Sequence, residues 1–154
     1  LLHDPFVSAH DEILTDAELV DLDEMFYRAD VVSLHAPSLP STRAMVGRHQ
    51  LSLMRDGACL INTARGALID ETALIAELET GRISAIIDVT DPEIADPASP
   101  LYLLPNVFLT PHIAGAIGTE RLRLGELVVE EIERFASGQP MRHAVVPALL
   151  EQLA

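Results

Sequence analysis

The chain has 154 residues, of which 49% are apolar, and 24 acidic against 10 basic residues give it a formal net charge of -14. The length fits one domain, and the apolar content excludes a disordered chain. Because the negative charge opposes binding to nucleic acids and to anionic membrane surfaces, we expect a small-molecule or protein partner.

The single cysteine, Cys59, lies in the apolar run "ACLIN" and cannot form an internal disulfide. It predicts a small buried residue and a reducing, cytoplasmic compartment. No apolar run approaches the roughly 20 residues of a membrane span. The opening residues, "LLHDPF", include no initiator methionine and begin inside an apolar run, so we interpret the chain as part of a longer protein.

Short β-type runs alternate with helix-type segments along the chain. Leu1 and Leu2 are predicted to end a strand, and a weak strand candidate covers 17–20. Asp21 can cap the short helix that follows, with Glu24 in the capping-box position. The next predicted elements are a strand at 30–35, a helix at 48–57 that stops at Gly57, and a strand at 58–62.

The second half repeats the alternation. A helix at 70–81 has Asp70 as N-cap and Gly81 as its stop, and strands are predicted at 83–88 and 107–110. The proline-rich loop 90–105 lies between them, and loops of this length are more often functional than merely connecting. An amphipathic helix at 119–137 precedes a proline-broken tail that we expect to pack on another part of the protein. The helix carries its apolar residues on one side: Leu122, Leu127, Val128, Ile132 and Phe135.

Repeated strand-helix units predict an α/β fold, with a parallel sheet that has helices on both faces. We expect the middle strands to be buried on both sides. Ligands of such sheets bind beyond the carboxyl ends of the strands. The predicted strands end in "HDP" (3–5), "HAP" (35–37), "NTARG" (62–66), "DVTDPE" (88–93) and "TPH" (110–112).

These strand ends bring Arg65, Asp88, Glu93, His35 and His112 to one edge of the sheet. Arg65 offers a fork of donors suited to a carboxylate, and it stays charged in a dry crevice. His112 can move a proton near neutral pH. Glu93, if it reaches His112, would hold the imidazole in one tautomer. A base beside an anion clamp suits proton transfer at an alcohol or carbonyl next to a carboxylate.

Each of these residues also has an ordinary structural explanation, because strand ends are polar in any α/β protein. "HDP" and "TPH" could be simple turns, His35 could be a satisfied loop residue, and Arg65 could cap carbonyls or pair with a surface acid. Only the joint pattern favours a functional site. His10, His49 and His143 have no partners at metal-ligand spacing, so no metal site is predicted.

Four stretches carry a resemblance to a known family: "DVVSLHAPSLPSTRAMVG", "LMRDGACLINTARGALIDETAL", "AIIDVTDPE" and "SPLYLLPNVFLTPHIAG". They cover residues 30–115 almost without interruption, and they resemble the NAD-binding domain of the D-isomer-specific 2-hydroxy acid dehydrogenases, of the phosphoglycerate dehydrogenase and glyoxylate-hydroxypyruvate reductase kind. The resemblance implies a partial Rossmann-like NAD-binding domain over 1–116. It also implies that the helix and tail over 117–154 pack back towards a substrate domain.

The resemblance further implies roles for individual residues. Arg65 matches the substrate-binding arginine, and His112 with Glu93 matches the acid-base pair. Asp88 matches the carboxylate that contacts the nicotinamide amide, and Asp4 the one that accepts from the adenosine ribose, which favours NAD over NADP. The remaining implied cofactor contacts are His35, Ala36, Pro37, Thr63, Ala64, His112 itself and Gly115.

Two departures from the family pattern limit these expectations. Ile94 stands where many members have a proline after the glutamate. No G-x-G-x-x-G occurs in the sequence, so the family's first strand and its glycine-rich loop are absent, as is its substrate domain. Because helix N-terminal amides bind cofactor phosphates, we expect the isolated chain to bind NAD weakly and to be inactive.

For the full-length protein the resemblance implies an NAD-dependent 2-hydroxy acid dehydrogenase and a homodimer. Two alternatives stay open. One is a non-catalytic NAD-sensing or protein-binding module on the same fold, since folds do not fix function. The other is a structural oligomerisation domain that uses the helix at 119–137.

Overall fold

The structure is a computed structural model that describes residues 1–8 and 16–147. His10 and residues 148–154 of the predicted tail lie outside the described residues. Four parallel strands form one sheet in the order β1 (Val31–Leu34), β2 (Cys59–Asn62), β3 (Ser84–Ile87) and β4 (Val107–Leu109). The predicted α/β fold with a parallel, Rossmann-like sheet is confirmed.

Three short helices precede the first three strands: α1 (Leu22–Arg28) precedes β1, α2 (Arg48–Leu53) precedes β2, and α3 (Glu71–Glu79) precedes β3. The predicted caps are present, because the carboxylates of Asp21 and Asp70 accept hydrogen bonds from backbone amides three residues on, at 2.8 and 3.1 Å. The capping box is incomplete, since the Glu24 carboxylate pairs with Arg28 at 2.8 Å.

The helix predicted at 48–57 is shorter in the structure and ends at Leu53. The guanidinium of Arg82 donates to the carbonyl oxygens of Leu51, at 2.8 Å, and of Met54. Helix carbonyls at a C-terminus need such partners. Arg82, from the turn after α3, therefore satisfies the end of α2.

Where two strands were predicted near the start of the chain, the structure has a single isolated β-bridge. Leu2 and Leu19 form an isolated parallel bridge, in which the Leu2 amide donates to Glu18 and the Val20 amide donates to Leu2. This bridge places the "HDP" segment beside the start of α1.

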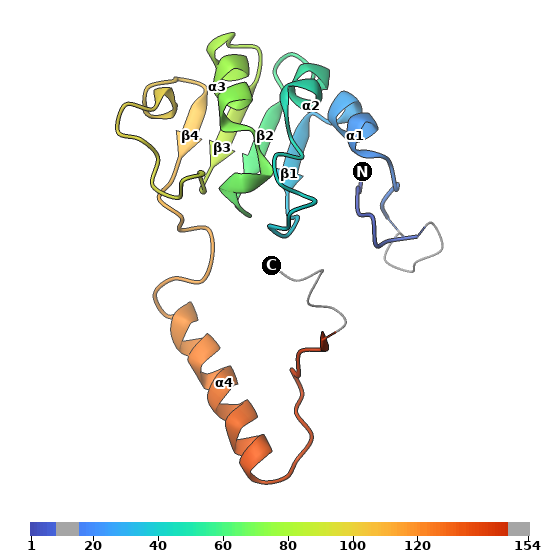
Figure 1. Cartoon of the computed structure of the whole chain (residues 1–154), viewed down its shortest axis with the longest axis vertical. Helices are drawn as coiled ribbons and strands as arrows, with labels where there is room; N and C mark the ends of the chain where they lie inside the picture. The colour runs from blue at the N-terminus through green and yellow to red at the C-terminus, as the bar shows by residue number, and fades with distance from the viewer. Residues whose placement is uncertain (9–15, 148–154) are drawn as a thin grey trace.

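The sheet is covered on one face only by the described residues, which corrects the expectation of helices on both faces. In the strand register, Val32, Leu60 and Ala85 lie in one row and are buried. The opposite face carries Val31 and Phe108, which are 57% and 64% exposed. Figure 1 shows α1, α2 and α3 side by side along the sheet, and α1 with α2 and α2 with α3 are in contact.

This arrangement also corrects the expected burial of Cys59. The alternation of β2 directs its side chain towards the uncovered face, where it is half-buried. The middle strands are therefore buried on one side, although Ile61 and Ile86 make the other side largely apolar as well. An apolar strand sequence is typical of a strand covered on both faces, but it does not show which chain segment provides the second cover.

The long helix α4 (Glu120–Ala136) extends away from the sheet at the end of an extended segment (Figure 1). Its apolar side chains are exposed: Leu122, Leu124, Leu127, Val128, Val129, Ile132 and Phe135. No helix within residues 1–8 and 16–147 is long and apolar enough to cross a membrane.

The tail returns along α4, and Glu131 holds it there. The Glu131 side chain, only 8% exposed as a residue, accepts hydrogen bonds from the amides of Arg142 and His143 at 3.0 and 3.1 Å. Burial alone would raise the pKa of Glu131, but these amides and the nearby charges of His143 and Arg134 lower it.

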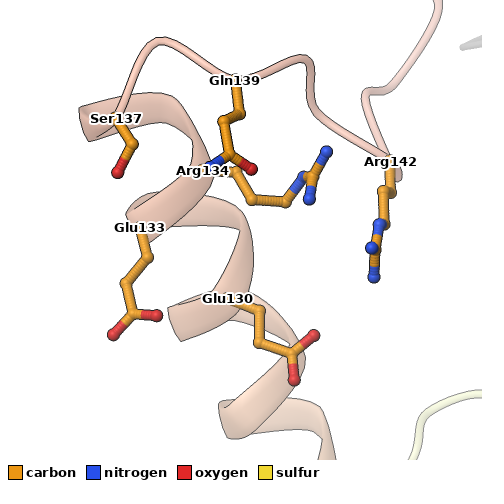
Figure 2. Close-up of a pocket in the computed structure, with 6 residues that line it drawn as sticks. All are labelled: Glu130, Glu133, Arg134, Ser137, Gln139 and Arg142. Atoms are coloured by element: carbon orange, nitrogen blue, oxygen red, sulfur yellow. The ribbon is translucent and has the colours of Figure 1, made fainter.

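Arg134 adds a second tie, donating from Nε and Nη2 to the Pro140 carbonyl at 2.9 and 2.7 Å. A polar hollow of about 340 Å³ lies between the end of α4 and the returning tail. Figure 2 shows the side chains that line it. It is lined only by charged and polar side chains: Glu130, Glu133, Arg134, Ser137, Gln139 and Arg142.

Candidate active site

Asp88, directly after β3, organises the segment that carries His112. Its side chain is 3% exposed, and the carboxylate accepts from the Thr110 hydroxyl at 2.5 Å and from the amides of Ile113 and Ala114 at 2.9 and 2.8 Å. Burial alone would raise the pKa of Asp88, but these hydrogen bonds and the neighbouring His112 lower it. The carboxylate therefore stays ionised and closes the turn after β4.

His112 has a left-handed backbone conformation, with φ of 53°. Such a conformation costs a residue other than glycine on the order of 1 kcal/mol and persists only where the surroundings impose it. Here the His112 amide donates to the Asp88 carbonyl at 2.9 Å. Strained residues of this kind cluster at functional sites.

The predicted contact between His112 and Glu93 is present. His112 Nδ1 lies 2.6 Å from Glu93 Oε1, and the two side chains are 41% and 73% exposed. A carboxylate at Nδ1 fixes the tautomer in which Nδ1 carries a proton, and it leaves Nε2 to exchange a proton with another molecule.

Arg65 lies on a loop that Asn62 closes. The fully buried Asn62 side chain donates from Nδ2 to the Arg65 carbonyl at 2.9 Å, and its Oδ1 accepts from the Ala64 amide at 3.1 Å. The Arg65 side chain is exposed, and its Nη1 donates to the Ala64 carbonyl at 2.7 Å. The loop is fixed while the guanidinium faces solvent, where it is accessible to an anion.

Gly66 allows this loop to touch the one that follows β3. A Cβ on Gly66 would overlap the carbonyl group of Thr90 and lie 2.6 Å from the Asp91 amide nitrogen. Only glycine permits so close an approach of two backbones. The loops that carry Arg65 and Glu93 are thus in direct contact.

Asp91, next to Thr90, makes two further polar contacts with other segments. Its carboxylate pairs with Arg43 at 2.9 Å, and its backbone amide interacts with the Glu71 side chain at the start of α3. Burial raises the pKa of Glu71, the Asp91 amide opposes this change, and the Asp91 carboxylate adds to it.

A cavity of about 580 Å³ lies beside the His112–Glu93 pair, between β4 and the loop over 90–105. Apolar side chains such as Leu101, Tyr102 and Phe108 line it, together with Asp88 and Thr90. Apolar cavities with a few polar groups are typical of small-molecule sites.

The other predicted contact residues lie in different surroundings. His35 is exposed and its Nε2 lies 2.9 Å from the Ser33 hydroxyl, as expected for a satisfied loop histidine. The Asp4 carboxylate accepts from the Phe6 amide at 2.8 Å, so "HDP" does form a turn, with Oδ2 left for another donor. The remaining residues follow the strands, and within the described residues their side chains form no polar contacts. Ala36, Pro37, Thr63 and Ala64 are half-buried, and Gly115 is exposed.

Sequence reasoning missed Asn62, Thr90 and Thr110 as supports of the site. Their common signal is a hydroxyl or amide side chain within two residues of a predicted site residue. The sequence does not show which backbone groups such a side chain reaches.

Comparison with known proteins places these features in a family. Residues 1–114 match the family model for the NAD-binding domain of D-isomer-specific 2-hydroxyacid dehydrogenases. The chain belongs to this family. A D-3-phosphoglycerate dehydrogenase of Archaeoglobus fulgidus is 37% identical over 146 residues, which are 94% of this chain and 28% of that protein. A glyoxylate reductase of Aeropyrum pernix is 38% identical over 124 residues, 80% of this chain and 37% of that protein.

Solved structures of the 2-hydroxyacid dehydrogenases agree. D-lactate dehydrogenase with NAD⁺ from Lactobacillus jensenii superimposes with a TM-score of 0.78 at 31% identity, covering 94% of this chain and 47% of that one. A D-isomer-specific 2-hydroxyacid dehydrogenase from Xanthobacter autotrophicus, in complex with NADPH and MES, has a TM-score of 0.73 at 32% identity, covering 86% and 56%. The chain thus spans well under two thirds of the length of these relatives.

Proposed function

We propose that the full-length protein interconverts a D-2-hydroxy acid and its 2-oxo acid, with a nicotinamide cofactor. The observation that carries this proposal is the His112–Glu93 pair, with 2.6 Å between Nδ1 and Oε1, together with the contact between the loop of Glu93 and the loop of Arg65. A proton-transfer group and an anion clamp are what a 2-hydroxy acid requires. No observation favours the non-catalytic module, since this pair is intact.

In the proposed reaction, His112 donates a proton from Nε2 to the C2 oxygen during reduction and removes it during oxidation. Glu93 stabilises the charged imidazole, and Arg65 orients the substrate carboxylate and polarises the C2 carbonyl. A bound nicotinamide supplies or accepts the hydride at C2.

We propose NAD as the cofactor, in preference to NADP. The donors and acceptors of the chain suit it, because Asp4 Oδ2 is available to ribose hydroxyls and would repel a 2′-phosphate. Asp88 keeps unused lone pairs on a carboxylate beside His112, which suits a nicotinamide amide.

For the rest of the molecule we propose a cytoplasmic homodimer in which α4 and the tail pack towards a substrate domain. The exposed apolar side of α4 supports the last proposal, since Ile132 and Phe135 are 60% and 74% exposed.

The test is reduction of glyoxylate, hydroxypyruvate and pyruvate by the full-length protein, with NADH and with NADPH. His112→Gln should lower kcat by at least about a hundredfold, because general acid-base catalysis contributes this much. His49→Gln, which removes an exposed histidine paired with Asp23 at 3.0 Å, is the matched control and should leave kcat unchanged. Absence of turnover in the wild type with every pair would contradict the proposal.

A further inference from the structure

The loop that carries Glu93 is exposed, yet the Glu93 carboxylate has to stay on His112. The side chain of Glu93 is 73% exposed, and the residues around it, 91 to 94, are exposed as well. A flexible glutamate in such a loop loses side-chain entropy when it is held in one position. The contact with His112 therefore depends on what fixes the backbone over 90–93.

Thr90 provides a tie within this turn. Its hydroxyl oxygen lies 2.8 Å from the Pro92 carbonyl oxygen and 3.1 Å from that of Glu93. The single hydroxyl proton is shared between two acceptors, one of them on Glu93 itself. Thr90 is half-buried and lines the same cavity as Glu93 and His112.

The backbone of Thr90 is fixed on its other side. Its carbonyl group lies directly over Gly66, and the following residue, Asp91, pairs with Arg43. The backbone of Thr90 is held by the Arg65 loop, and its hydroxyl is bonded to the turn that carries Glu93. Thr90 thus connects the two.

We propose that Thr90 is a positioning residue, whose hydroxyl sets the Glu93 carboxylate against His112 Nδ1. This inference rests on the proposed function of the same site. The Thr90 hydroxyl acts on the imidazole indirectly, through the carbonyl oxygens of Pro92 and Glu93.

The test compares Thr90→Val, which keeps the shape and removes the hydroxyl, with Thr90→Ser, which keeps the hydroxyl. In the full-length protein Thr90→Val should lower kcat for 2-oxo acid reduction by about tenfold, part of the contribution of acid-base catalysis. Thr90→Ser should stay within about twofold of the wild type, and KM should change little in both, since Arg65 is untouched.

Two further variants separate positioning from a loss of folding. Thr80→Val removes a comparable hydroxyl, which donates to the Glu77 carbonyl at 2.6 Å at the end of α3, and should leave kcat unchanged. In a Glu93→Gln background, Thr90→Val should have less than about a twofold further effect, because its route of action is already lost.

The inference is overturned if Thr90→Val retains wild-type kcat, if Thr90→Ser loses as much as Thr90→Val, or if the effect persists undiminished beside Glu93→Gln. These outcomes all require an active wild type. An inactive wild type with every substrate contradicts the proposed function instead, so the two failures are distinguishable.

Discussion

Gly66 lies beneath the backbone of Thr90, and this contact joins the two loops of the candidate site. In the sequence, Gly66 directly follows Arg65 and has the local appearance of an ordinary turn residue. The structure instead shows a glycine required by the close approach of a second segment, 24 positions further along the chain. Nothing in the local pattern "TARGA" indicates that neighbour.

Gly66→Ala should destabilise the 154-residue chain by about 1–3 kcal/mol, as expected when an added methyl group is forced against a fixed neighbour. Urea denaturation measures the change. Gly125→Ala is the matched control, because a Cβ at Gly125 would meet no atom within 4 Å. Equal stability of the Gly66→Ala and wild-type chains would show that the loops move apart at little cost.

The charged site residues were predictable because each follows an apolar strand, and parallel strands end at one edge. The contact of Glu93 with His112 follows from that placement. The second role of Asp88 was not predictable, because its carboxylate accepts from the amides of Ile113 and Ala114, more than 20 positions away. A sequence shows which side chains can accept hydrogen bonds but not which amides reach them.

At the scale of elements, helix starts were easier to predict than helix ends. Asp21 and Asp70 cap the helices that directly follow them, so the signal and its effect are adjacent in sequence. The end of α2 depends on Arg82, which lies 28 positions beyond Met54. Gly57, the predicted stop, lies beyond the residue at which the helix ends, and Arg82 is too distant in sequence to indicate that end.

The hairpin of α4 and the tail depends on Glu131, and Glu131→Gln should release the tail from the helix. An amide offers one oxygen instead of two and no charge to the backbone amides of Arg142 and His143. Hydrogen exchange of these two amides should become faster, while the interior of α4 exchanges as before. Glu133→Gln, on the same helix, is the control and should leave both amides protected.

Acid should have the same effect as this substitution. The pKa of Glu131 is lowered from its ordinary value of 4.5, so its contribution is complete above that pH in the folded chain. The contribution is lost as the pH falls through the lower folded value. Unchanged exchange of the Arg142 amide in this acid range would show that the tail is held by Arg134 alone.

For the whole molecule, the uncovered face of the sheet is the main difference from expectation. The strand sequences predict apolar residues on both sides of the sheet, and the structure places apolar residues on both sides. The described chain supplies helices for one side only, so Val31 and Phe108 remain exposed. Exposed apolar faces of this kind mark contacts with other chain segments or proteins.

The isolated 154-residue chain should bind NAD too weakly to saturate in the micromolar range. The sequence contains no G-x-G-x-x-G, and helix N-terminal amides of that loop bind the cofactor phosphates. Isothermal titration calorimetry of the chain with NAD measures this directly. A micromolar Kd would mean that the strand-end residues, Asp4 and Asp88 among them, supply most of the affinity.

The contact between Gly66 and Thr90 also has a consequence for protein engineering. The loop over 62–66 and the turn over 88–93 pack backbone against backbone, because Gly66 has no side chain at the point where the turn crosses it. Exchanging only one of them with a related dehydrogenase would pair surfaces that were not selected together. Chimaeras made to change substrate preference should therefore transplant both segments as a unit.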